Sequence, residues 1–206
     1  MGLLKYLDKD LNDFESRANN VVIVCAGDSI TGYNNSREKE IQRITVLTYP
    51  QFLADELKEN NIADCGIAGQ FSRYALSDVR LYLDNFKNST HFVIGYGTND
   101  LATKVPSEII LGNMKTIIQN LLEREKTPLV LNVPYANKSN FSTNGLDRIK
   151  KQRDYHNQGL ANLCKERNVQ MIDICSLLGD SHFTDAIHPD IIGAKLIAKE
   201  VAKYLK

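Results

Sequence analysis

The sequence predicts an α/β fold in which one parallel β-sheet is covered by helices on both faces. Short apolar runs alternate with longer amphipathic segments along the chain, and this order is typical of repeated strand–helix–strand units. The first run, residues 21–26, is apolar at every position, which indicates a strand buried on both faces. The chain has 206 residues, of which 43% are hydrophobic, enough for the core of a single domain.

Each expected element follows from its local pattern. Apolar runs predict strands, and apolar side chains at helical spacing predict helices. The expected strands are residues 21–26, 62–66, 92–96, 129–133 and 169–173. The expected helices are residues 3–14, 49–59, 75–86, 109–122, 146–167 and 191–205. Two long polar loops, residues 32–49 and 134–147, are expected to border a pocket.

Composition excludes several classes of partner. Lys and Arg together number 25, as do Asp and Glu, so no basic excess favours binding of nucleic acid or of an anionic membrane. Residues 1–10 lack the pattern of a signal peptide and no apolar run is long enough to span a bilayer, so we expect a cytoplasmic protein. The four cysteines have no metal-like spacing and are expected to be reduced and buried; they are Cys25, Cys65, Cys164 and Cys175.

Candidate reactive residues follow the carboxyl ends of the expected strands. Ser29 follows the first strand, Gly69 the second and Asn99 the third, while Asp185 and His188 come after the fifth. The carboxyl ends of parallel strands share one edge of the sheet. We therefore expect these residues to meet there although they are far apart in the sequence.

Together these residue types predict nucleophilic catalysis. A serine hydroxyl needs a general base, here His188, and Asp185 three residues earlier can fix its tautomer. The backbone N–H groups of Ser29 and Gly69 and the side chain of Asn99 can hold an oxyanion. Taken singly, each has an ordinary explanation: Ser29, His188 and Asn99 can cap helices, and Asp185 and Gly69 can sit in turns. The joint pattern favours catalysis.

Four further residues are candidates for the lining of a substrate pocket: Asp28, Tyr33, Tyr135 and His182. For His182, an exposed loop position is the favoured explanation. Asp28 and Asp100 also suggest the carboxylate pair of a glycosidase, but turn geometry and local hydrogen bonds explain both.

Four motifs resemble those of the GDSL/SGNH hydrolase family and occur in the same order. Residues 27–30 (GDSI) resemble the nucleophile motif, with Ile30 in place of leucine, and residues 67–69 (IAG) resemble the segment that holds the oxyanion glycine. Residues 97–100 (GTND) resemble the motif with the oxyanion asparagine, and residues 185–189 (DAIHP) resemble the D-x-x-H-P motif. The chain departs from many members at Asp64, where they carry an asparagine.

The resemblance implies a flavodoxin-like three-layer α/β/α sandwich with a five-stranded parallel sheet of order 2-1-3-4-5, forming one domain over residues 1–206. It also implies hydrolysis of a small-molecule acyl ester through an acyl-serine intermediate, with no metal or other cofactor. Loops rich in Asn, Ser and Tyr favour short acyl groups, such as acetyl, on polar alcohols such as sugars. The same site can serve a thioesterase, a lysophospholipase or an acyltransferase, and a non-catalytic binding module is the remaining alternative. The sequence indicates no oligomeric state.

Overall fold

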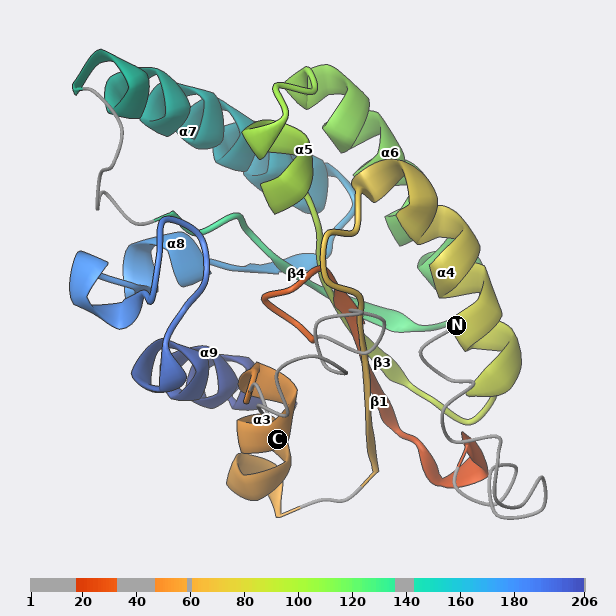
Figure 1. Cartoon of the computed structure of the whole chain (residues 1–206). Coiled ribbons are helices and arrows are strands. Elements are labelled where there is room, and N and C mark those ends of the chain that lie inside the picture. Colours follow the sequence, from red (N-terminus) through yellow and green to blue (C-terminus); the bar gives the residue numbers. More distant parts are fainter. Residues whose placement is uncertain (1–17, 33–46, 59–60, 136–142, 206) are drawn as a thin grey trace.

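The sheet is parallel throughout, and its strand order is β2-β1-β3-β4-β5, which confirms the predicted topology (Figure 1). The computed structural model describes residues 18–32, 47–58, 61–135 and 143–205; the predicted helix at 3–14 lies outside them. The strands are β1 (Ile23–Gly27), β2 (Ile62–Gly66), β3 (His91–Gly95), β4 (Thr127–Leu131) and β5 (Gln170–Ile172).

Helices cover both faces of the sheet and complete the three layers (Figure 1). One face carries α4 (Ser72–Asn85), α6 (Ser107–Glu123) and α7 (Thr143–Glu166). The other face carries α3 (Tyr49–Leu57) and α9 (Ile191–Ala202), which pack against each other. Two short helices, α5 (Thr98–Ala102) and α8 (Ile174–Leu177), follow β3 and β5, and the short helix η2 (Asp180–His182) follows α8.

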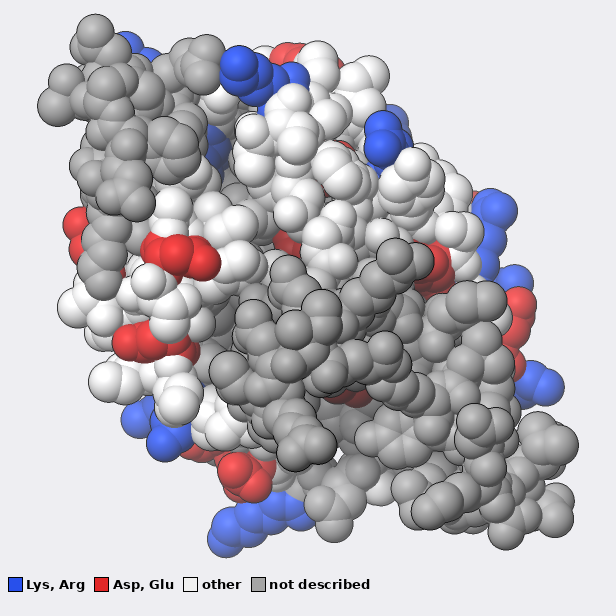
Figure 2. All heavy atoms as spheres, in the orientation of Figure 1, with Lys and Arg blue, Asp and Glu red and all other residues white. Residues whose placement is uncertain are grey.

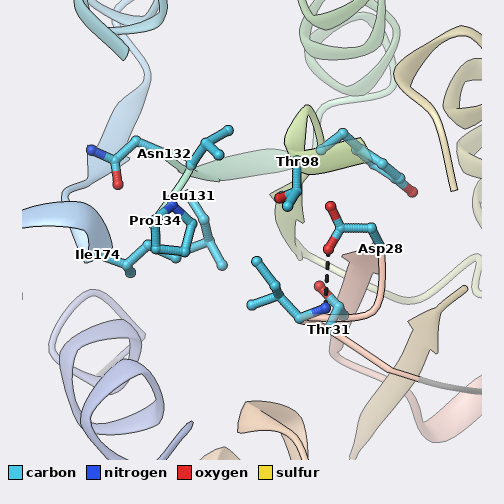
Figure 3. A pocket seen from close by; sticks show the side chains of 11 residues that line it. Asp28, Thr31, Thr98, Leu131, Asn132, Pro134 and Ile174 are labelled. Carbon is cyan, nitrogen blue, oxygen red and sulfur yellow. Dashed lines mark hydrogen bonds between the residues drawn. The ribbon is translucent and has the colours of Figure 1, made fainter. Parts of the chain in front are cut away.

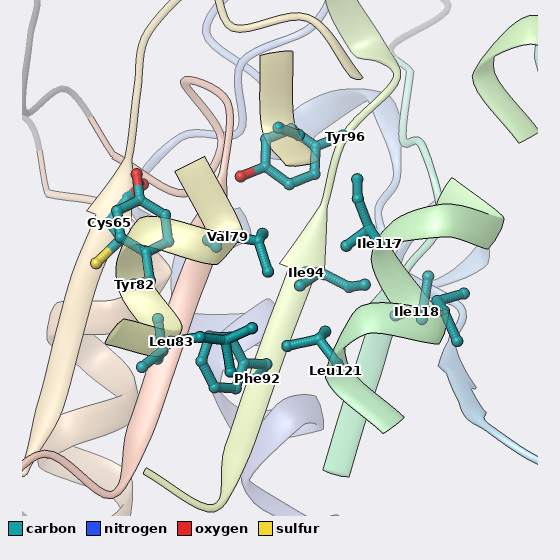
Figure 4. Close-up of a cluster of buried hydrophobic side chains, with 14 of the residues drawn as sticks. Cys65, Val79, Tyr82, Leu83, Phe92, Ile94, Tyr96, Ile117, Ile118 and Leu121 are labelled. Carbon is teal, nitrogen blue, oxygen red and sulfur yellow. The ribbon is translucent and has the colours of Figure 1, made fainter. Parts of the chain in front are cut away.

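The strands feed two separate cores because successive side chains point to opposite faces. In β3, Phe92 and Ile94 belong to the core under α4 and α6, whereas Val93 belongs to the core under α3 and α9. Both cores are apolar, so the strand sequences show no polar alternation. Figure 4 shows the first core, in which the β3 side chains meet Val79, Tyr82 and Leu83 of α4 and Ile117, Ile118 and Leu121 of α6.

Several boundaries differ from the prediction by a few residues, and two of the differences place a helix where a loop was expected. Helix α7 begins at Thr143, so the polar loop expected to run to residue 147 ends earlier. Asn144 and Gly145 are poor helix formers, and the first turn carries no apolar periodicity that could reveal it. The break predicted at residues 97–100 also begins a helix, α5, which is too short to show a period.

The described helices include none that is both long and apolar enough to cross a bilayer. On the face in Figure 2, the acidic and basic side chains drawn in colour are interspersed around the rim, without a broad field of one sign.

Candidate active site

Ser29 lies in a tight turn immediately after β1. The backbone N–H groups of Thr31 and Gly32 both donate to the carbonyl oxygen of Asp28 at 3.0 Å. Gly27 permits this turn, because a Cβ there would lie 2.1 Å from Thr31 Oγ1. The strand therefore turns sharply, and Ser29 sits at the carboxyl edge of the sheet with 6% of its surface exposed.

The structure brings Ser29, His188 and Asp185 into one hydrogen-bonded line. His188 Nδ1 lies 2.6 Å from Asp185 Oδ2, and its Nε2 lies 2.9 Å from Ser29 Oγ. When the neutral imidazole carries its proton on Nδ1, that N–H donates a hydrogen bond to the Asp185 carboxylate. Nε2 then accepts a hydrogen bond from the Ser29 hydroxyl. This is the arrangement that a general base requires.

The two ends of the loop that carries Asp185 and His188 are held together by backbone contacts. Phe183 and Pro189 form an isolated antiparallel bridge, and the Thr184 N–H donates to the His188 carbonyl at 2.9 Å. These contacts fix the loop that ends at the start of α9. The imidazole is thus held on a rigid segment although it belongs to no strand or helix.

The Asp185 carboxylate remains charged in this setting. Its Oδ1 accepts hydrogen bonds from the backbone N–H groups of Ile187 and His188, each at 2.8 Å. Partial burial by itself would raise the pKa of Asp185, but the hydrogen bonds from His188 and Ile187 outweigh it and lower this pKa. A charged Asp185 can stabilise an imidazolium at His188.

The three candidate oxyanion donors lie on adjoining segments. The N–H groups of Ser29 and Gly69 donate to no group within the described part of the chain. Gly69 has φ +76°, a conformation that favours glycine, and open space surrounds its Cβ position. The Asn99 side chain donates one amide hydrogen to the Gln70 carbonyl at 3.0 Å. The second hydrogen of the same Asn99 amide can donate to another oxygen atom.

Asp28 lies beside the nucleophile but is buried, with 1% of its surface exposed. Its Oδ1 accepts a hydrogen bond from the Ile30 N–H at 3.0 Å, whereas its Oδ2 has no hydrogen-bond partner among the described residues. Burial raises the pKa of Asp28 to about 6, and the nearby Thr98 hydroxyl and His188 only partly oppose this.

A small cavity of about 10 Å³ adjoins Asp28, about the room that a single water-sized group needs. Figure 3 shows Asp28 and Thr98 on one side of it and Leu131, Pro134 and Ile174 on the other. Its lining is mostly apolar, and it extends between the ends of β1, β3 and β4.

Asp100 is held by Ser72 and not by a reacting group. Its Oδ2 accepts from the Ser72 N–H at 2.9 Å and its Oδ1 from the Ser72 hydroxyl at 2.8 Å. Asp28 and Asp100 are both 1% exposed, which fits local structural roles better than the carboxylate pair of a glycosidase.

The remaining pocket candidates have different surroundings. Tyr135 lies near the candidate base: burial raises the pKa of its hydroxyl, with Arg153 opposing and Asp185 adding to this rise. His182 instead accepts a hydrogen bond at Nδ1 from the Gly179 N–H at 3.0 Å, a local contact within η2. Tyr33 lies outside the described residues.

Sequence reasoning gave little weight to several buried polar residues at this edge. Ser72 and Thr98 have no signal of their own, because only the folded sheet brings Ser72 to Asp100 and Thr98 to Asp28. His156 of α7 is fully buried, and neither ring nitrogen has a partner in the described chain. Burial lowers the pKa of His156 to about 4, so it is neutral at pH 7.

The described residues contain no cluster of His, Cys, Asp and Glu that could hold a metal ion. All four cysteines are free thiols; Cys25, Cys65 and Cys164 are buried and Cys175 is half-buried.

Comparison with known proteins assigns the chain to a class of ester hydrolases. The sequence model of the GDSL-like lipase/acylhydrolase family matches residues 25–196. The chain therefore belongs to the GDSL-like lipase/acylhydrolase family. No curated protein sequence matches it.

Solved structures share the fold at low sequence identity. A member of the lipolytic G-D-S-L family from Veillonella parvula has a TM-score of 0.71 at 18% identity, over 89% of this chain and 97% of that one. A GDSL-like lipase from Bacteroides thetaiotaomicron has a TM-score of 0.69 at 18% identity, over 98% and 92%. An acetyl xylan esterase from Geobacillus stearothermophilus has a TM-score of 0.69 at 15% identity, over 89% and 95%.

Proposed function

We propose that this ester hydrolase uses Ser29 as its nucleophile and removes short acyl groups, acetyl above all, from polar alcohols such as sugars. One observation carries the mechanism: the hydrogen-bonded line from Ser29 Oγ through the His188 imidazole to Asp185, with distances of 2.9 and 2.6 Å. A serine in this setting can lose its proton to the imidazole as it attacks a carbonyl carbon.

The reaction proceeds in two halves. Ser29 Oγ attacks the ester carbonyl while His188 Nε2 takes the hydroxyl proton, and the oxyanion is held by the Ser29 and Gly69 N–H groups and the Asn99 amide. The C–O bond to the alcohol breaks as His188 returns the proton to the leaving oxygen. Water then attacks the acyl-serine, with His188 taking its proton and passing it to Ser29 as the acid leaves.

The preference for short acyl groups is supported by the cavity of about 10 Å³ beside Asp28 and Ile30, the neighbours of Ser29. Its size matches one water-sized group, and its lining includes Leu131, Val133 and Ile174. Such a space is too small for a long alkyl chain, although Ser29 is not itself among the residues that line it. Because one structural neighbour is an acetyl xylan esterase, acetylated sugars are the first natural esters to assay.

The test compares the wild type with Ser29→Ala on p-nitrophenyl acetate, p-nitrophenyl octanoate and acetylated xylose. We expect Ser29→Ala to lower kcat at least about a thousandfold, and the wild type to have a higher kcat/KM on acetate than on octanoate. Ser77→Ala, at an exposed serine of α4 whose hydroxyl donates to the Tyr74 carbonyl, is the matched control. Equal rates for the wild type and Ser29→Ala would refute the nucleophile, and a preference for octanoate would refute the short acyl group.

A further inference from the structure

The first turn of α4 is fastened to the segment that carries a candidate oxyanion donor. Asn99 of α5 binds the Gln70 carbonyl at 3.0 Å, and Asp100 accepts two hydrogen bonds from Ser72, at 2.9 and 2.8 Å. Figure 1 shows the start of α4 beside α5 at the carboxyl edge of the sheet. Arg73 follows Ser72 directly, so its backbone belongs to the segment that is fastened to Asn99 and Asp100.

Two aromatic rings hold the Arg73 guanidinium. Its Cζ lies 4.9 Å from the centroid of the Phe71 ring and 4.7 Å from that of the Tyr74 ring. Such cation–π contacts stabilise a guanidinium on the ring face and restrict its motion. A planar cation that is already fixed loses less entropy when it binds a ligand. Arg73 is nevertheless exposed and can contact a molecule in solution.

The nearby carboxylates are bound to other groups. Asp100 accepts from Ser72 at both oxygens, and Asp78 accepts from the side-chain amide of Gln70. In the ranges that the structure describes, Arg73 forms no ion pair. The cation at this edge is therefore not neutralised by an acidic side chain of the described chain.

Helix stability does not explain a cation at this position. The amino end of a helix carries a partial positive charge, so Arg73 in the first turn of α4 (Ser72–Asn85) is unfavourable there. Residues that oppose local stability are concentrated at functional sites.

We propose that Arg73 binds an anionic group, a carboxylate or a phosphate, on the alcohol part of the ester that Ser29 cleaves. This inference rests on the proposed function and adds a substrate class to it. An ester of such an alcohol would present its acyl carbon to Ser29 while its anionic group binds the Arg73 guanidinium. Arg73 makes two charge-assisted hydrogen bonds to such an oxyanion in a fork geometry that lysine does not reproduce.

The test pairs each anionic ester with an uncharged ester that carries the same acetyl group. The carboxylate arm compares para-acetoxybenzoate with its methyl ester, and the phosphate arm compares acetylglycerol phosphate with acetylglycerol. Each is assayed with the wild type, Arg73→Gln, Arg73→Lys and Arg80→Gln. Arg80 is the matched control, because it is exposed on the same helix and binds only Asn120, at 3.2 Å, among the described residues.

Arg73→Gln is expected to lower kcat/KM about tenfold on at least one anionic ester, mostly through KM, and to leave its neutral partner unchanged. Arg73→Lys should restore only part of the loss, and Arg80→Gln should change neither. The arm that responds identifies the anion. Equal effects of Arg73→Gln on charged and neutral esters, or no effect on any, would overturn the inference while the ester hydrolase stands. A wild type that cleaves no ester would instead overturn the proposed function, and this inference with it.

Discussion

Asp28 and Asp185 lie at the same edge of the sheet, and His188 acts electrostatically on both carboxyl groups. The two carboxyl groups differ in burial and in hydrogen bonding. Asp185 has an exposed side chain, 55% of its surface, and both its oxygens accept hydrogen bonds. Asp28 is 1% exposed, and one of its oxygens has no partner in the described chain. The pKa of Asp185 is accordingly lowered, whereas that of Asp28 is raised to about 6.

The difference shows that burial and hydrogen bonds together, more than the nearest charge, decide which carboxylate stays ionised. Asp185 obtains its hydrogen bonds from the exposed loop that also carries the imidazole. Asp28 is enclosed by the ends of three strands and holds the turn through the Ile30 N–H. Asp185 is therefore suited to stabilise a positive charge on the imidazole, and Asp28 is suited to stabilise the turn after β1.

The largest expected effect concerns Asp185. Asp185→Asn keeps the shape of the side chain but removes the charge and can favour the wrong tautomer of His188, so kcat on p-nitrophenyl acetate should fall by about a hundredfold to a thousandfold. Asp180→Asn, an exposed change in η2, is the control. A loss below about tenfold would mean that Asp185 does not orient the imidazole.

Asp28→Asn is expected to change stability more than chemistry. The native protein keeps the Asp28 proton up to about pH 6, whereas the ordinary pKa of this carboxyl is 3.8. The native state therefore binds more protons than the unfolded state within this window, and stability falls as pH rises through it. The variant cannot ionise and should be more stable by about 3 kcal/mol at pH 7.5.

Urea unfolding of the wild type and Asp28→Asn at pH 3.5 and pH 7.5 measures this difference. The gain should nearly vanish at the acidic pH, where the wild-type carboxyl is protonated in the native state and mostly protonated in the unfolded state. The same gain at both pH values would show that ionisation of Asp28 is not its source.

The buried His156 should act in the opposite direction over much of the same range. Its pKa is about 4 in the folded chain, whereas the ordinary pKa of histidine is 6.5. The unfolded state therefore binds more protons between these values, and stability falls as pH drops from 6.5 to 4. His156→Leu removes this titration and should stabilise the protein by about 2 kcal/mol at pH 5 relative to pH 7.5.

Thermal unfolding of His156→Leu and of the double variant with Asp28→Asn tests whether the two effects are separate. The two pH dependences should disappear one at a time, leaving a flatter stability profile in the double variant. A loss of stability at pH 5 that persists in His156→Leu would assign it to other groups.

Much of the fold was readable from the sequence because it depends on local patterns. Apolar runs such as residues 21–26 predicted strands covered on both faces, and their spacing predicted the order of elements. The start of α7 was not predictable, because Asn144 and Gly145 are poor helix formers and the first turn has no apolar periodicity.

The sequence by itself determined which residue types follow each strand, and the rule that parallel strands share one carboxyl edge was enough to predict that Ser29 would meet His188. Only the tertiary structure decided the environment of each side chain. Asp28, Asp100 and Asp185 look alike in sequence. One is buried with an unpartnered oxygen, one is bound by Ser72 and one is exposed beside an imidazole. Burial and hydrogen bonding depend on neighbours from distant parts of the chain, and these interactions set the charge of each carboxylate.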